Sequence, residues 1–85
     1  MTTKNLDEAV AVNLVYDDKL KKVFPKWVRW NNRLYPVTKV GLHHTYKQGE
    51  VLYHVFSVIT KTLFMRLVLN TKNLNWKLEQ IADGI

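Results

Sequence analysis

Residues 24–37 read FPKWVRWNNRLYPV, and this stretch decides the fold that we expect. Two aromatic-rich runs flank Asn31 and Asn32. Asparagine tolerates the positive φ angles that a two-residue turn of type I′ requires. The pattern therefore predicts a β-hairpin that folds back at this asparagine pair. The cross-strand pairs that follow are Trp30 with Arg33, Arg29 with Leu34, Val28 with Tyr35, Trp27 with Pro36 and Lys26 with Val37.

The predicted register separates the two tryptophans of the hairpin. Side chains alternate between the two faces of a strand, so Trp27 and Trp30 point to opposite faces. A sheet with one buried face encloses only one of them. We expect Trp30 to face the core, and Trp27 to share an exposed outer face with Arg29 and Leu34.

The rest of the chain predicts further strands over residues 9–16, 51–60 and 63–69, and a last strand that ends near Glu79. A helix after a capping box at Asn5 and Glu8 is the competing interpretation of residues 9–16, which β-branched valines disfavour. Beyond the hairpin the alternation slips near Thr38 and Lys39, which predicts a β-bulge there. The expected fold is all-β, a single antiparallel six-stranded meander that forms a small SH3-like or half-open barrel.

The next predicted turn, at Lys61 and Thr62, joins two strands into a ribbon that is apolar on both faces. Its expected inner pairs are His54 with Leu69, Phe56 with Leu67 and Val58 with Met65. Its outer pairs are Val55 with Val68 and Ile59 with Phe64, so these four residues are either covered or form a protein interface. A second turn over residues 70–73 would place Leu67 opposite Trp76 and Leu69 opposite Leu74.

Length and composition limit the classes of protein to which the chain can belong. The 85 residues contain no cysteine, and 47% are hydrophobic, which indicates a single domain over residues 1–85 stabilised by packing alone. Residues 1–8 are polar, and we expect a flexible tail. No apolar run has the length of a membrane span, and residues 1–20 do not resemble a signal peptide, so we expect a cytoplasmic protein and no membrane partner.

Positive charge is concentrated in one part of the chain. The formal net charge is +6, and residues 19–49 contain no acidic residue. Their eight cations are Lys19, Lys21, Lys22, Lys26, Arg29, Arg33, Lys39 and Lys47. Such a field favours an anionic partner, nucleic acid above all. The alternative is that the lysines only keep the domain soluble and its strand edges unpaired.

Catalytic and metal-binding patterns are missing from the sequence. His43 and His44 would point to opposite faces of a strand, so at most one could join His54 at a metal site. Ser57 is the only serine and lacks a nucleophile motif, and no glycine loop could cradle a phosphate. We therefore expect no metal, no cofactor and no enzymatic activity.

The remaining functional signal is a basic and aromatic surface around the hairpin. Single-stranded nucleic acid is held by aromatic side chains that stack on bases within a basic groove. The candidate residues for this role are Trp27, Arg29, Lys26, Lys22, Arg33, Leu34 and Lys39. The alternative is a protein-interaction module or a small homodimeric accessory protein that uses Val55, Ile59, Phe64 and Val68 or the Trp27 surface.

One family resemblance rests on scattered aromatic and apolar positions. They are Pro25, Val28-x-Trp30, Arg33-x-Tyr35-x-Val37 and Val40, followed by Leu74-x-Trp76-x-Leu78 and Ile81. Over about residues 10–81 this pattern resembles a short bacterial β-domain family without assigned function, some members of which are encoded with translesion DNA polymerases. The resemblance implies the β fold and no catalytic residues. The chain lacks the glycine of that family's first tight turn and carries His44 where a tryptophan is expected.

Overall fold

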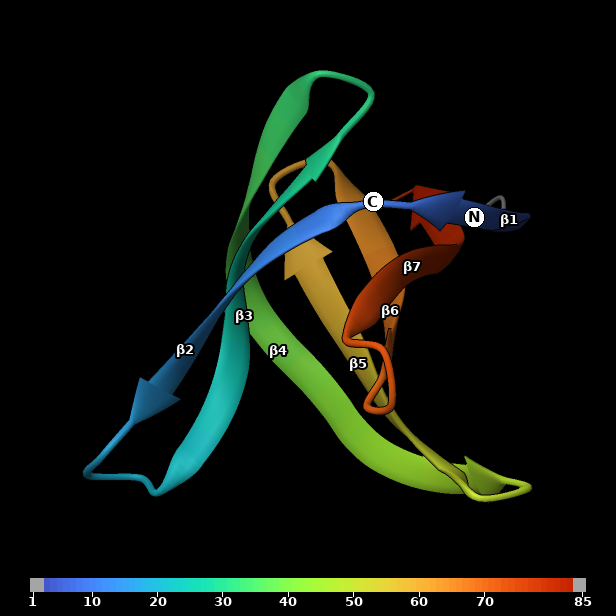
Figure 1. The fold of residues 1–85 in the computed structure, drawn as a ribbon. Coiled ribbons are helices and arrows are strands. Elements are labelled where there is room, and N and C mark those ends of the chain that lie inside the picture. Colours follow the sequence, from blue (N-terminus) through green and yellow to red (C-terminus); the bar gives the residue numbers. More distant parts are fainter. Residues whose placement is uncertain (1–2, 84–85) are drawn as a thin grey trace.

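Residues 3–83 form one antiparallel sheet of seven strands in this computed structural model, and every regular element in that range is a strand. The strands are β1 (Thr3–Ala9), β2 (Ala11–Asp17), β3 (Lys22–Trp30), β4 (Arg33–Gln48), β5 (Val51–Thr60), β6 (Leu63–Asn70) and β7 (Asn75–Asp83). Their order in the sheet is β1-β7-β6-β5-β4-β3-β2 (Figure 1). The all-β prediction is confirmed, with seven strands in place of six.

The additional strand is β1. Residues 3–8, which we expected in a flexible tail, pair with β7 instead, while residues 1–2 lie outside the described residues. Polar contacts hold β1 in place: Gln80 Nε2 donates to Asn5 Oδ1 at 2.9 Å, and Lys77 Nζ lies 3.3 Å from Asp7 Oδ1. Leu6 alone among the side chains of β1 packs against the core.

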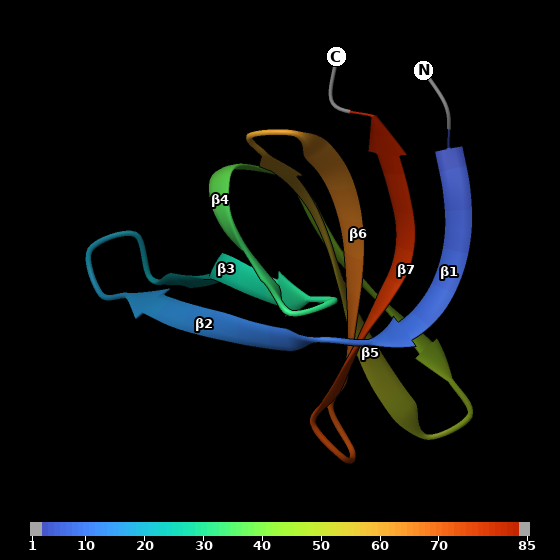
Figure 2. The ribbon, with the colours of Figure 1, turned by 90° about the horizontal axis from the view of Figure 1, so that it is seen from above.

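The two edge strands of the sheet are consecutive in the chain. Only Val10 separates β1 from β2, and Figure 2 shows the chain bending there, with β1 beside β7 and β2 beside β3. The Val10 N–H donates to the Trp76 carbonyl at 3.4 Å. Because β1 and β2 run end to end and do not pair with each other, the sheet does not close. The predicted SH3-like barrel is therefore not confirmed.

The hairpin at residues 31–32 has the predicted geometry. Asn31 and Asn32 have φ values of 52° and 61°, as a type I′ turn requires. Four of the five predicted cross-strand pairs are present, and the fifth, Lys26 with Val37, is absent because the ladder between the two strands ends at Trp27 and Pro36. Trp30 packs against the core, and its Nε1 donates to Glu8 Oε1 at 3.0 Å. Trp27 pairs with Pro36 on the opposite face and is half-buried.

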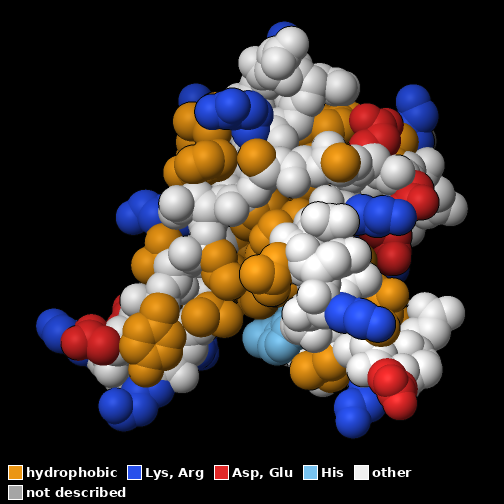
Figure 3. Space-filling view, viewed as in Figure 1, with side chains coloured by type: hydrophobic (Ala, Val, Ile, Leu, Met, Phe, Trp, Pro, Cys, Tyr) orange, Lys and Arg blue, Asp and Glu red, His pale blue; other side chains and the backbone are white. Residues whose placement is uncertain are grey.

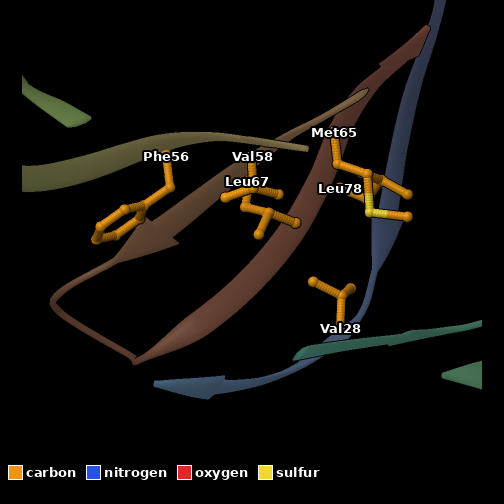
Figure 4. Close-up of a cluster of buried hydrophobic side chains, with 6 residues drawn as sticks. All are labelled: Val28, Phe56, Val58, Met65, Leu67 and Leu78. Carbon is orange, nitrogen blue, oxygen red and sulfur yellow. The ribbon is translucent and has the colours of Figure 1, made fainter. Parts of the chain in front are cut away.

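The core lies on the inner face of β5, β6 and β7, where Val28 of β3 covers it (Figure 4). The β5–β6 register is the predicted one in every pair. Burial of each large apolar side chain contributes roughly 1.5–3 kcal/mol, so these six side chains dominate the stability. They are Val28, Phe56, Val58, Met65, Leu67 and Leu78.

The predicted register between β6 and β7 is wrong by two residues from Leu67 to Asn70, and by three residues beyond the register shift between Arg66 and Leu67, where Met65 pairs with Ile81. Leu67 pairs with Leu78, and Leu69 pairs with Trp76. The turn starts one residue later than expected because Asn70 Oδ1 accepts the N–H groups of residues 72 and 73, at 2.9 and 3.3 Å. Leu74 closes the turn with a φ of 61°. A shift of two residues keeps each side chain on its expected face.

Candidate functional site

A cleft separates β3 from β4 over most of their length. The two strands pair only next to their turn, as far as Trp27 and Pro36. Beyond that pair, β3 continues beside β2 and β4 continues beside β5. In Figure 1 the strands start side by side and then diverge as two arms. The edges that face each other across this β3–β4 cleft are therefore unpaired.

Bulges explain why the pairing stops. The register of β3 against β2 shifts at Lys26, and the register of β4 against β5 shifts at Thr38 and again at Gly41. The predicted bulge near Thr38 is thus confirmed, and each bulge bends its strand away from the other. Pro36 does not itself end the ladder, because it lies in a non-hydrogen-bonded pair with Trp27 and its missing N–H faces away from β3.

Two adjoining hollows occupy the cleft. The first, of about 300 Å³, lies between Lys26 on β3 and Lys39 on β4. The second, of about 490 Å³, lies between Lys22 and His43. Both are lined by the same two apolar side chains, Phe24 and Val40. The two hollows are therefore neighbours that share Phe24 and Val40 in their lining.

The rim of the cleft carries positive charge. Lys22, Lys26 and Lys39 are all exposed, and no acidic residue lines either hollow. A cleft lined by charge of one sign concentrates the field within it. Figure 3 shows the notch between the two arms, with hydrophobic side chains along it, histidine at its inner end, and both cations and acidic side chains on each arm.

The outer face of the hairpin adjoins the closed end of the cleft. Trp27, Arg29 and Leu34 share this face, and Leu34 is 57% exposed. Trp27 follows Lys26 directly in the chain, so the outer face leads to the first hollow. Arg33 lies apart from both, beside the turn, and lines a separate hollow of about 270 Å³ together with Leu34.

The predicted residues thus fall into two neighbouring groups and one outlier. The cleft brings Lys22, Lys26 and Lys39 together, and the outer face holds Trp27, Arg29 and Leu34.

Sequence reasoning missed the role of His43 in this cleft. Its ring stacks on Phe56 with centroids 4.1 Å apart and planes 13° from parallel. His43 Nε2 lies 2.8 Å from His54 Nδ1, a hydrogen-bond distance. Partial burial, and secondarily the charges of His54 and His44, lower the pKa of His43 below its usual 6.5. The signal would have been the second register shift, at Gly41, because the bulge at residue 38 alone would turn His43 outward and the shift at Gly41 returns it to the inner face opposite Phe56.

The alternative protein interface is only partly at the surface. Val55 and Val68 are buried, with 3% and 7% of their surface exposed. Ile59 and Phe64 line a hollow of about 280 Å³ on the outer face of the sheet, next to Leu42, which is 58% exposed. Two of the four predicted residues therefore border a free surface.

Other observations concern the described range alone. Residues 3–83 contain no group of three or more His, Cys, Asp or Glu side chains placed to hold a metal ion. Nor does this part of the chain include a helix with the length and apolar character needed to span a membrane.

No family model matches the chain, and no curated protein or solved structure matches it. The family resemblance stays a prediction.

Proposed function

We propose that this chain is a non-enzymatic module that binds single-stranded nucleic acid. The observation that carries the proposal is the β3–β4 cleft, whose two neighbouring hollows share the apolar residues Phe24 and Val40 and are lined by three lysines and no acidic residue. A nucleic-acid strand has the complementary pattern, a regular row of anions and flat apolar bases. The outer face of the hairpin extends this surface beyond the closed end of the cleft.

Each part of the surface has a role in this proposal. Lys22, Lys26 and Lys39 neutralise phosphates and release their counterions. The Trp27 indole stacks on a base, and the Arg29 guanidinium contacts the backbone or a base face. The unpaired strand edges offer N–H and C=O groups to base edges. A duplex hides its base faces, so these contacts favour a single strand.

Salt titration of oligonucleotide binding tests the proposal. Fluorescence anisotropy with a labelled twelve-nucleotide single strand should show a slope of log K against log salt of roughly −2, about 0.7 for each of three lysines. Replacing Lys26 and Lys39 with glutamine should weaken binding and make the slope shallower by about 1.4. Lys72→Gln is the matched control, because Lys72 is exposed in the β6–β7 turn, and it should change neither value.

A tryptophan substitution separates stacking from charge. Trp27→Ala should weaken the same complex about tenfold while the salt slope stays unchanged. Tyr46→Ala is the matched aromatic control, because Tyr46 is 40% exposed near the far end of β4. Absence of binding at low salt, or binding that is indifferent to salt and to Trp27, would overturn the proposal.

The unpaired edges of β3 and β4 favour a second candidate function. A protein partner could add an extended segment to these edges through main-chain hydrogen bonds. That interaction would respond weakly to salt, since it depends on backbone pairing and apolar contact. The homodimer, the cytoplasmic location and the lack of enzymatic activity stay predictions.

A further inference from the structure

His43 is an unusually well-fixed aromatic surface at the open part of the cleft. One face of its ring rests on Phe56, which is 1% exposed and in turn lies 5.8 Å from Trp76 between ring centroids. The hydrogen bond with His54 fixes the ring within its plane. The imidazole is nevertheless exposed and borders the second hollow. A partner that stacks on it loses little of its binding energy to ordering the side chain.

The opposite wall of the second hollow is apolar and carries one cation. Leu20, which is 63% exposed, and Phe24 face His43 across the hollow, and Lys22 lies between them in the chain. The volume of about 490 Å³ falls within the range of small-ligand sites, which suits a nucleotide unit better than a whole strand. A flat group can thus lie between an imidazole and an apolar wall.

The charge of the two walls sets the orientation of the ligand. Because the pKa of His43 is below its usual value, the ring is neutral at pH 7 and offers a stacking face in place of a phosphate contact. Lys22 is the cation that lines this hollow. The flat base therefore belongs beside His43, and the phosphate belongs at Lys22.

We infer that the second hollow takes one base of the bound strand, stacked on His43, with the adjoining phosphate held by Lys22. The inference rests on the proposed function and adds to it a site for a single nucleotide. The rest of the strand then follows the first hollow and the outer face of the hairpin.

An abasic oligonucleotide series tests this base site. We expect one abasic position of a twelve-nucleotide strand to weaken binding to the wild-type protein about tenfold. His43→Ala should weaken binding of the intact strand by a similar factor and abolish the effect of the abasic position. His44→Ala is the matched control, since His44 is exposed and pairs with Val55 on the other face of β4, and it should behave as the wild type.

Two further measurements keep the test decisive if His43→Ala does not fold. His43→Phe retains a flat ring and should retain both the affinity and the abasic effect. In the wild-type protein, the imidazole proton resonances of His43 should shift on addition of the strand, while those of His44 should not. Lys22→Gln should weaken binding and make the salt slope shallower by about 0.7.

The possible failures are distinguishable. If no strand binds at low salt, or if an acidic extended peptide binds in the cleft instead, the proposed function fails and the base site fails with it. If the strand binds with the expected dependence on Lys26 and Trp27 but is indifferent to His43 and to every abasic position, only the base site is overturned.

Discussion

The β5–β6 hairpin and the β3–β4 hairpin both have a two-residue loop, yet they differ in how far their strands stay together. From Tyr53 to Ile59, β5 pairs with β6 through seven successive positions without a register shift. The β3–β4 pairing comprises only four pairs. The loop sets the register of each ribbon, while bulges decide how far that register extends.

The two hairpins therefore contribute differently: the β5–β6 hairpin supplies most of the core, and the β3–β4 hairpin borders the proposed binding cleft. Four of the six core side chains come from β5 and β6, namely Phe56, Val58, Met65 and Leu67. The β3–β4 hairpin supplies Val28 to the core and then opens into the cleft. We expect substitutions in the first hairpin to change folding and substitutions along the second to change binding.

The largest effect should come from a truncation in the β5–β6 hairpin. Leu67 is fully buried, and Leu67→Ala should lower the free energy of unfolding by about 2–5 kcal/mol, through lost transfer energy and the cavity that remains. Leu34→Ala in the other hairpin removes a 57% exposed side chain and should cost less than about 0.5 kcal/mol. Urea unfolding measures both, and equal losses would contradict the comparison.

The next largest effect should be a difference in stability loss between substitutions of the two tryptophans. Trp30→Ala removes a side chain that packs on the core and bonds Glu8, and we expect a loss of about 3 kcal/mol. Trp27→Ala should cost about 1 kcal/mol, because Trp27 lies on the outer face. Thermal unfolding of both variants checks this order. A larger loss for Trp27→Ala than for Trp30→Ala would show that Trp27, and not Trp30, is the core tryptophan of this hairpin.

The asparagine turn should show a smaller, position-specific effect. Alanine at position 31 must adopt the φ of 52° that Asn31 has, so Asn31→Ala should cost about 1–2 kcal/mol. Asn32→Gly is the matched change, because glycine accepts a φ of 61° without strain, and stability should be equal or higher. Chemical denaturation measures both. If Asn31→Ala is harmless, the turn does not determine the register.

Acid should weaken the fold through His43. The pKa of His43 is below 6.5 in the folded protein, so the unfolded chain binds more protons and stability falls as the pH drops below about 6.5. His43→Gln cannot take up the proton and should lose less stability between pH 7.5 and 5.5. Urea midpoints at the two pH values give the comparison. An equal loss in both proteins would show that His43 is not the group responsible.

The smallest effect belongs to the edge strand β1. The Lys77–Asp7 pair is open to solvent, with 57% and 72% of the two side chains exposed. Asp7→Asn should therefore change the free energy of unfolding by less than about 0.5 kcal/mol. Equilibrium unfolding at low and high salt measures it. A larger loss would mean that β1 depends on this pair more than on its backbone pairing with β7.

Local chemistry made part of the fold predictable. The positive φ angles that asparagine tolerates indicated the hairpin at residues 31–32, and strict alternation gave the β5–β6 register. Strand β1 lacks such a signal, because its side chains are polar apart from Leu6 and Ala9 and its partner lies at the other end of the chain. The β6–β7 register depends on the side chain of Asn70, which alternation does not reveal.

The candidate site was predictable to a similar extent. The run of cations over residues 19–49 indicated the strands β3 and β4, which border the cleft. The division of those cations between a cleft and an outer face depends on the bulge at Lys26, which no turn residue or break in alternation indicated. His43 was considered only as a metal ligand, because its stacking partner Phe56 lies on another strand.

The pairing of Thr3 with Ala82 has a consequence for synthesis on the ribosome. Strand β1 emerges before any other strand, and its partner β7 emerges after all of them. During translation the β2–β3 ribbon can form early, while β1 has no sheet edge to join until β7 has emerged. Docking of β1 is therefore a late, long-range step in folding, and until then the edge of β7 stays open to other chains.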